Sequence, residues 1–263
     1  MQRVYVPLIL FNIVVALCAI VFVYTPNSMR DVYKEFLRPF SRNGPFVDLD
    51  EYPELAPVTE SYAAIKQEYA SFCTDKENKF PVFAEFDLNE EAPYEDMYER
   101  WRVVILRVQG VDVQNITKDF PRTLHALDMH ERNRPWYMPT YKIRHAMFSI
   151  LEPGKHILPH VGAFRSVLRY HLPIDIPYNN KNNECWLRVN GIAHYWKNGE
   201  PVLFDDTFVH EAANGSDQKR VVFFVDIEKH FPLVIHWIDR FVTFLIQSHT
   251  KFSEFLTYAN TNI

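Results

Sequence analysis

The pattern of apolar and polar positions divides the chain into an apolar N-terminal run, a helix-rich middle and a strand-rich second half. The run VYVPLILFNIVVALCAIVFVY, residues 4–24, contains no charged residue. As a helix it would extend about 30 Å, enough to cross a bilayer. It exceeds the ~7–15 apolar residues of a signal peptide, and no small-residue cleavage site follows it. We therefore expect a transmembrane anchor over residues 1–26, then a juxtamembrane helix and an extended, proline-containing linker over 27–56.

Periodicity in the rest of the chain predicts a mainly β domain with flanking helices. Apolar residues at helical spacing predict helices over 60–73 and 120–128. From about residue 142, short alternating segments are separated by turns, and Asn190-Gly191 is typical of a two-residue hairpin. Many short strands with regular turns favour an antiparallel sandwich or barrel over a βαβ fold. The predicted main domain covers residues 57–229, with its core barrel at 142–229.

The C-terminal residues 230–263 are predicted to form an amphipathic helix. Trp237, Ile238 and Phe241 alternate with Asp239 and Arg240 at helical spacing. Two interpretations remain open, in which the helix either packs on the main domain or lies on a membrane surface.

The charge distribution and the cysteines indicate the compartment of the protein and exclude one class of ligand. The net charge of −5 argues against a nucleic-acid-binding protein. Three cysteines, Cys18, Cys73 and Cys185, have neither a disulfide-framework nor a zinc-site spacing, which favours a reducing compartment. Basic residues follow the apolar run (Arg30, Lys34, Arg38 and Arg42), whereas only Arg3 precedes it. The positive-inside rule therefore predicts a single-pass membrane protein with a cytoplasmic catalytic domain. The sequons at Asn115 and Asn214 would matter if the domain instead faced a secretory lumen.

Basic side chains in apolar strands are the strongest candidates for chemistry. The segment LPHVGAFRSVLRYHLP contains His160, Arg169 and His171, and the last two share a strand face. Arg220 opens the apolar strand RVVFFVDI. Buried charges need partners, and no acid lies nearby in sequence, so we expect the partner to be a ligand. His160 and His210 stand at strand edges, and imidazole suits iron, zinc or copper. Together these residues suggest a pair of metal-binding histidines beside a site for a small dicarboxylate.

These residues resemble a known family. The segments HVGAFRSVLRYHLPI and GEPVLFDDTFVHEAANGSDQKRVVFFVDI are similar to the aspartyl/asparaginyl β-hydroxylase family of Fe(II)- and 2-oxoglutarate-dependent dioxygenases. His160 precedes Arg169 by nine residues and His171 by eleven, and His210 precedes Arg220 by ten. These spacings match the family pattern, and the likeness covers about residues 147–228. The resemblance implies a double-stranded β-helix, the jelly-roll barrel of cupins.

The resemblance also implies roles for individual residues. His160 and His210 would bind Fe(II). Arg220, with Ser149, would hold the distal carboxylate of 2-oxoglutarate, the arginine through a charge-assisted pair. Arg169 and His171 would meet the other carboxylate. Fe(II), 2-oxoglutarate and O₂ are the implied cofactor and cosubstrates, with ascorbate as an optional addition, and C–H hydroxylation would accompany the formation of succinate and CO₂.

One position departs from the usual set of two histidines and a carboxylate. Gly162 stands where the carboxylate of an H-x-D motif would be, as it does in the protein-hydroxylase branch of the family. The resemblance then implies water at that position, and halide is a further candidate. Asp206, four residues before His210, would hold such a water or orient a ligand from outside the coordination shell. An ordinary turn aspartate is the alternative.

Three functions remain open, two of them enzymatic and one non-enzymatic. The anchor and an upstream likeness in YPELAPVTESYAAI and FPRTLHALD favour a lipid A hydroxylase in a bacterial inner membrane, acting on an acyl chain. Gly162 and the sequons favour a hydroxylase of aspartyl or asparaginyl side chains in proteins. A membrane-anchored barrel that binds a dicarboxylate without catalysis is the third. The sequence does not determine the oligomeric state.

Overall fold

The structure is a computed structural model that describes residues 35–40, 44–74, 101–138, 142–162, 165–247, 257 and 260. The chain separates into two compact units, residues 1–42 with 163–165, and residues 43–162 with 166–263. In the first unit the described residues form a helical turn at 35–37 that continues into η1 (Arg38–Phe40). The predicted anchor at 1–26 lies outside the described residues, as does most of the predicted juxtamembrane helix. Among the described helices, none combines the length and hydropathy needed to span a membrane.

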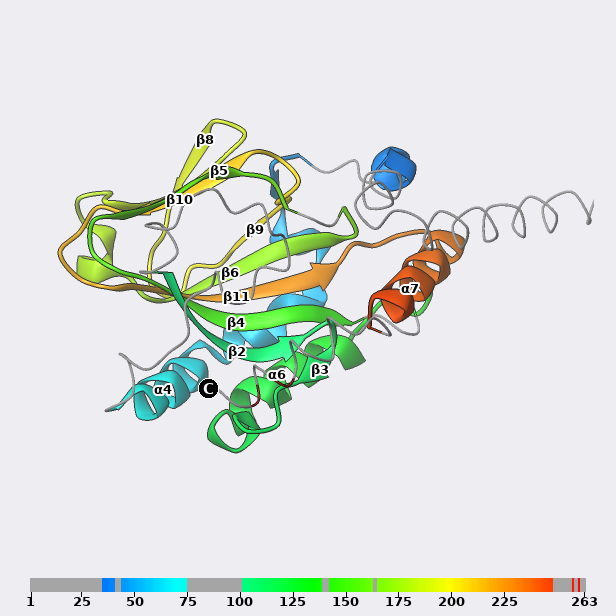
Figure 1. The fold of residues 1–263 in the computed structure, drawn as a ribbon, viewed down its shortest axis with the longest axis horizontal. Helices are drawn as coiled ribbons and strands as arrows, with labels where there is room; N and C mark the ends of the chain where they lie inside the picture. Colours follow the sequence, from blue (N-terminus) through cyan, green and yellow to red (C-terminus); the bar gives the residue numbers. More distant parts are fainter. Residues whose placement is uncertain are drawn as a thin grey trace, which may run out of the picture. The chain divides into compact units, whose positions relative to one another are not determined.

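The second unit is mainly β and contains two antiparallel sheets (Figure 1). The larger sheet has the strand order β1-β9-β6-β11-β4-β2-β3, and the smaller has the order β5-β10-β7-β8. From β4 to β11 the chain crosses between the sheets after each strand except at the β7–β8 hairpin. This order is that of the expected double-stranded β-helix. The strands are β1 (Phe46–Val47), β2 (Trp101–Val108), β3 (Val111–Asp112), β4 (Ile143–Leu151), β5 (Lys155–His160), β6 (Val167–Asp175), β7 (Cys185–Val189), β8 (Ile192–Tyr195), β9 (Val202–Phe204), β10 (His210–Asn214) and β11 (Arg220–Glu228).

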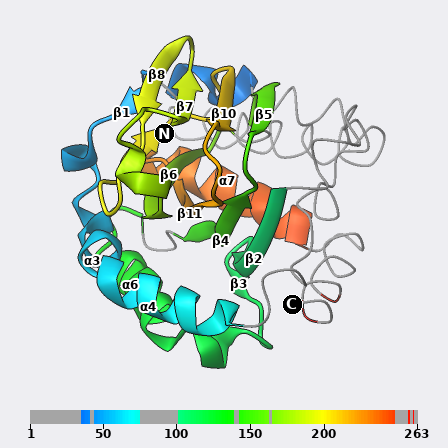
Figure 2. The same ribbon diagram turned by 90° about the vertical axis from the view of Figure 1, so that its left-hand side faces the viewer.

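Helices cover the outer face of the larger sheet. Figure 2 shows α3, α4 and α6 on one side of this sheet and the smaller sheet on the other. The helices of the unit are η2 (Leu49–Glu51), η3 (Pro53–Leu55), α3 (Ala56–Glu60), α4 (Tyr62–Cys73), η6 (Thr117–Asp119), α6 (Pro121–Arg132), η7 (Pro177–Asn180) and α7 (Leu233–Gln247). The helices expected at 60–73 and 120–128 are thus present as α4 and α6.

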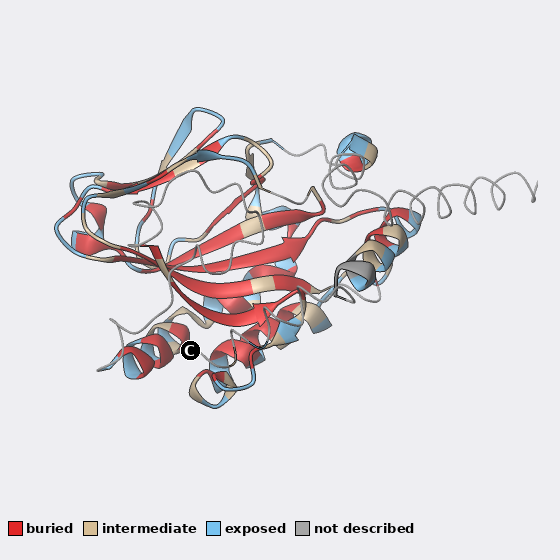
Figure 3. Cartoon of the chain, in the orientation of Figure 1, coloured by how far each residue is buried: buried red, intermediate tan, exposed pale blue. Residues whose placement is uncertain are grey.

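Two apolar clusters hold these layers together. The first lies between the larger sheet and the helices. There the ring centroid of Phe148 lies 4.7 Å from that of Tyr69 and 4.8 Å from that of Phe223. The second lies between the two sheets and includes Leu187 and Val222. Because both faces of β11 are covered, all nine of its residues are buried (Figure 3). Burying each large apolar side chain contributes about 1.5–3 kcal/mol, which explains why this strand is almost continuously apolar.

Turn chemistry and one short strand fix the edges of the sheets. Asn190 and Gly191 both have positive φ, 49° and 79°, as the predicted type I′ hairpin turn requires. Part of the predicted linker is ordered differently from our expectation. Phe46 pairs with Phe204 across β1 and β9, and Leu55 is buried. This segment therefore belongs to the β unit, because its apolar side chains complete the sheet edge and the helical layer.

Candidate active site

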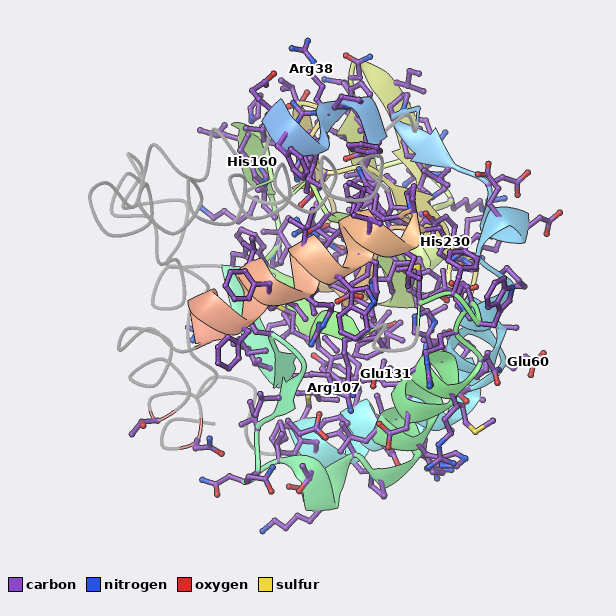
Figure 4. The ribbon with its side chains drawn as sticks, turned by 90° about the vertical axis from the view of Figure 1, so that its right-hand side faces the viewer. Arg38, Glu60, Arg107, Glu131, His160 and His230 are labelled. Carbon is purple, nitrogen blue, oxygen red and sulfur yellow. The ribbon has the colours of Figure 1, made fainter. Side chains whose placement is uncertain are left out.

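Two histidines from adjacent strands of the smaller sheet meet at the mouth of the barrel. His160 ends β5 and His210 begins β10, and the antiparallel register places them directly opposite each other. Their ring centroids are 4.1 Å apart, with the planes inclined at 51°. Figure 4 labels His160 on β5. His210 is buried and His160 is exposed. The paired strands therefore bring together two residues that are 50 positions apart in the sequence.

Backbone carbonyls fix which nitrogen of each ring can bind a metal. The Nδ1 atom of His160 lies 2.8 Å from the carbonyl oxygen of Leu158, and that of His210 lies 3.0 Å from the carbonyl oxygen of Phe208. A carbonyl only accepts, so each Nδ1 carries the proton and donates it. The Nε2 atom of each neutral ring then keeps its lone pair. His210 Nε2 is buried without a hydrogen-bond partner among the described residues. This orientation by the second ring nitrogen is typical of metal-binding histidines.

Arg220 provides a buried positive charge with no carboxylate counter-ion among the described residues. The residue is 1% exposed, and its Nη1 atom donates to Ser149, at 3.3 Å from Oγ and 3.4 Å from the carbonyl oxygen. Its Nε atom has no hydrogen-bond partner, and no carboxylate pairs with it among the described residues. Burial lowers the pKa of Arg220 to about 10. A buried, unpaired guanidinium is expensive, so this position fits a carboxylate ligand.

A continuous series of ring contacts connects Arg220 to the histidine pair. The guanidinium of Arg220 lies over the ring of Trp196, 4.8 Å from its centroid. Ring centroids are then separated by 5.8 Å from Trp196 to His171, 5.0 Å from His171 to Phe204 and 5.6 Å from Phe204 to His210. Trp196 Nε1 and His171 Nδ1 are both buried without a partner among the described residues. The site therefore combines an apolar wall with several buried polar atoms that a ligand could hydrogen-bond.

Arg169 has protein partners, contrary to our expectation that its counter-ion would be a ligand. Its Nε atom lies 2.9 Å from Asp226 Oδ1, and its Nη2 atom lies 3.0 Å from Asp206 Oδ2. Asp226 stands directly opposite Arg169 on β11, and His145 on β4 binds its other oxygen at 3.0 Å. Burial alone would lower the pKa of Arg169, but the two carboxylates raise it. The sequence analysis did not foresee these pairings, because Arg169 is distant in sequence from both Asp206 and Asp226.

The Asp206 carboxylate fills the space beside Gly162. The Gly162 amide donates to the Asp206 carbonyl oxygen at 2.7 Å, and a Cβ atom added at Gly162 would overlap the Asp206 carboxylate. Asp206 Oδ1 is buried without a hydrogen-bond partner among the described residues. Burial raises the pKa of Asp206 to about 7, against the opposing effect of Arg169. Within the described residues, no set of three His, Cys, Asp or Glu side chains is placed to hold a metal.

Electrostatics keep the two inner imidazoles neutral. Burial, with the neighbouring His160 and Arg169, lowers the pKa of His210 to about 3. Burial also lowers the pKa of His171 well below its ordinary value, and Arg169 and Arg220 add to this effect. Neutral imidazole is the form that binds metals. The donor set therefore fits Fe(II) at the histidine pair.

The structure brings all the predicted site residues into one cluster, and it adds three that sequence reasoning missed. His160, His210, Arg169, His171, Arg220, Ser149 and Asp206 are linked by the contacts above. Trp196, Asp226 and His194 were not anticipated, and His194 Nε2 is also buried without a partner among the described residues. Period two would have found Asp226, because it shares a strand face with Arg220 on β11. Trp196 lies just after the end of β8, where strand alternation gives no signal.

Comparisons with known proteins find relatives of this chain. A family model described as aspartyl/asparaginyl beta-hydroxylase matches residues 59–230. An ornithine lipid ester-linked acyl 2-hydroxylase from Rhizobium tropici is 31% identical over 214 residues, which are 81% of this chain and 69% of that protein. The aspartyl/asparaginyl beta-hydroxylase of Homo sapiens is 30% identical over 48% of this chain, and the match spans 16% of that longer protein. Among solved structures, a Pseudomonas putida prolyl-4-hydroxylase has a TM-score of 0.41 and 16% identity, covering 72% of this chain and 91% of its own.

Proposed function

The chain belongs to the aspartyl/asparaginyl β-hydroxylase family, and we propose that it is an Fe(II)- and 2-oxoglutarate-dependent dioxygenase that hydroxylates the acyl chain of a membrane lipid. The observation that carries this proposal is the buried Arg220 without a carboxylate partner among the described residues, connected by ring contacts to two histidines. A cation and a metal-binding pair in one apolar site match a cosubstrate that has a carboxylate at its far end and a metal-binding group at the other.

Different residues would bind the metal and the cosubstrate. His160 and His210 would hold Fe(II) through their Nε2 atoms. When bound, Fe(II) with 2-oxoglutarate and O₂ supplies the oxidation of a C–H bond to an alcohol, with succinate and CO₂ as coproducts. Arg220 would bind the distal carboxylate together with the Ser149 hydroxyl, and the indole N–H of Trp196 is a further donor. Phe204 and Trp196 line the space between, where they exclude water and strengthen each charge-assisted bond.

Asp206 would orient a water molecule beside the Fe(II) ion held by the two histidines. Arg169 holds one oxygen of this carboxylate and leaves the other without a partner among the described residues. Because Gly162 has no side chain, the Asp206 carboxylate is the acidic group at the position where an H-x-D motif would place its own. His171 would contact the cosubstrate near the metal, while Arg169 acts mainly through Asp206. Loss of Arg169 should therefore change metal affinity more than cosubstrate affinity.

A lipid is the favoured substrate class. The Rhizobium tropici relative, matched over 81% of this chain, is named for hydroxylating an ester-linked acyl chain of ornithine lipid. The uncharged run at 4–24 supports an inner-membrane anchor with the catalytic unit on the cytoplasmic side. Lipid A, suggested by the sequence, and ornithine lipid are the two candidates of this class. A periplasmic reporter active at the C-terminus would contradict the cytoplasmic orientation.

Hydroxylation of aspartyl or asparaginyl residues in proteins is the second candidate. Gly162 favours it, because the protein-hydroxylase branch resembled by the sequence has glycine there. One argument for a secretory setting is weakened, however. The sequon residue Asn214 is fully buried, and its Nδ2 atom donates to the carbonyl oxygens of Leu151 and Gln218 at 2.9 and 2.7 Å. It is not available for glycosylation in the folded protein.

Mass spectrometry of lipids from a Gram-negative host that makes both ornithine lipid and lipid A tests the proposal. Expression of the full chain should add one oxygen to an acyl chain of one of these lipids, and the His210→Ala variant should not. His156→Ala is the matched control, because His156 lies on the same strand as His160 but pairs with Glu211 on the surface. An unchanged lipid extract, with succinate still formed by the purified protein, would reject the lipid and retain the reaction class.

A further inference from the structure

Helix α7 (Leu233–Gln247) buries polar side chains together with Ile235, and it presents an apolar face to the outside. A helix on a soluble domain normally buries its apolar face. In α7, His236 is fully buried and Asp239 is 3% exposed. The exposed side chains of its described part are all apolar: Leu233 (47%), Val234 (61%), Trp237 (50%), Phe241 (41%) and Phe244 (60%). Figure 4 faces this helix, which lies across the front of the molecule.

Ion pairs fix this orientation. Arg144 on β4 pairs with Asp239 of α7, and its Nε atom lies 2.9 Å from Oε1 of Glu228 on β11. Arg240 of α7 binds the same Glu228 oxygen through Nη1 at 2.9 Å. Removing one member of such a buried ion pair leaves an uncompensated charge in the interior, which is strongly destabilising. Rotating the helix to bury its aromatic face would leave these charges without partners, so the outward apolar face is a property of the fold.

The exposed face is large and continuous. Leu233 and Phe244 are separated by eleven residues, or about 16 Å along the helix axis. Trp237 and Phe241 lie between them on the same side, one turn apart. Contiguous apolar patches of this kind on a protein surface mark contact with another apolar phase or partner.

We propose that this face of α7 lies in the interfacial region of a lipid bilayer. None of the exposed residues in the described part of the helix is charged, and its one acid, Asp239, is buried and paired. A protein partner would usually meet a rim of polar and charged groups, whereas interfacial helices present Trp, Phe and Leu to the acyl boundary. The same chain also contains the uncharged run at 4–24, which would hold the unit beside a membrane. Membrane contact by α7 does not require the proposed reaction.

Site-specific photocrosslinking identifies what covers the face. Phe241→p-benzoylphenylalanine in the full-length chain, reconstituted in vesicles of phosphatidylethanolamine and phosphatidylglycerol, should give adducts of lipid mass on irradiation. Tyr195→p-benzoylphenylalanine is the matched control, because Tyr195 on β8 is similarly exposed, at 45%. It should give no lipid adduct. Both substitutions are at exposed aromatic positions, and circular dichroism verifies folding before irradiation.

Other adducts would overturn the inference. A crosslink from position 241 to a peptide within residues 1–34 would show that the chain covers its own helix, and a crosslink to a second copy would show a dimer interface. Absence of lipid adducts at 241 would also reject membrane contact. The experiment separates this inference from the proposed reaction, because it can be repeated in the His210→Ala background, where crosslinking should persist although hydroxylation is lost.

Discussion

Two buried arginines of the same domain have opposite surroundings. Arg107 on β2 is 3% exposed and pairs with three carboxylates, those of Asp112, Asp128 and Glu131, at 2.5 to 3.0 Å. Figure 4 shows Arg107 and Glu131 together below α7. Arg220 on β11 is 1% exposed, and no described carboxylate pairs with it. Nearby acids raise the pKa of Arg107 although burial opposes this, whereas burial lowers the pKa of Arg220 to about 10.

The difference separates a structural charge from a functional one. A buried cation whose donors are all satisfied stabilises one arrangement of the chain, and removing it leaves its acids without a partner. A buried cation without a partner costs stability in the free protein, and a ligand that supplies the missing anion recovers this cost. The buried polar atoms around Arg220 and His210 that lack partners among the described residues are therefore the strongest evidence for the site.

The largest effect is expected from the metal-binding pair. His210→Ala should abolish succinate formation and Fe(II) binding, because one of the two Nε2 donors is lost. Isothermal titration with Mn(II), which does not support turnover, measures binding without the reaction. His156→Ala, on the same sheet, should retain both. Succinate formation by His210→Ala at the wild-type rate would remove this histidine from the site.

Arg107→Met should destabilise the fold by about 3–5 kcal/mol, because Asp112 and Asp128 lose this cation and Glu131 is left with Lys142. Chemical denaturation monitored by circular dichroism measures the change. The affinity of the folded fraction for 2-oxoglutarate should stay at the wild-type value. A stable Arg107→Met variant with weakened 2-oxoglutarate binding would reverse the roles assigned to the two arginines.

Arg220→Met should have the complementary outcome. The 2-oxoglutarate affinity should fall by about 100-fold, equivalent to about 2.7 kcal/mol, because charge-assisted hydrogen bonds to the distal carboxylate are lost. The melting temperature should stay the same or rise, since an unpaired buried charge is replaced by an apolar side chain. Arg220→Lys should recover part of the affinity. A large loss of stability in Arg220→Met would indicate a structural role.

A smaller effect on stability is expected from pH. His130 on α6 is fully buried, its Nδ1 donates to the carbonyl oxygen of Glu54 at 2.9 Å, and burial lowers its pKa from 6.5 to about 4. The unfolded chain therefore binds more protons between these values. Stability from this group is complete above pH 6.5 and is lost as the pH falls to about 4, by at most about 3 kcal/mol.

The His130→Gln variant isolates this contribution. Its free energy of unfolding should depend less on pH between about 4 and 6.5 than that of the wild type. Urea denaturation at a series of pH values measures both slopes. Equal slopes would show that other groups determine the acid sensitivity.

The sequence predicted the parts of the site that depend on local periodicity. Arg169 and His171 share an inward face because side chains alternate along β6, and the spacing from His210 to Arg220 follows from a short turn between β10 and β11. The counter-ions could not be predicted in this way. Asp226 lies 57 residues from Arg169 and meets it only through strand pairing. The orientation of α7 could not be predicted either. An amphipathic pattern does not show which face is buried when ion pairs attach the polar face to the domain.

The most direct test of the central claim is to follow both products of one reaction. The purified full chain would be incubated with Fe(II), 2-oxoglutarate and ¹⁸O₂ in vesicles containing ornithine lipid and lipid A. We expect succinate and a hydroxylated acyl chain in equal amounts, each with one ¹⁸O atom, and neither product from His210→Ala. Hydroxylated lipid formed without succinate, or with oxygen from water, would contradict the assignment of Arg220 and the histidine pair to a 2-oxoglutarate-dependent site.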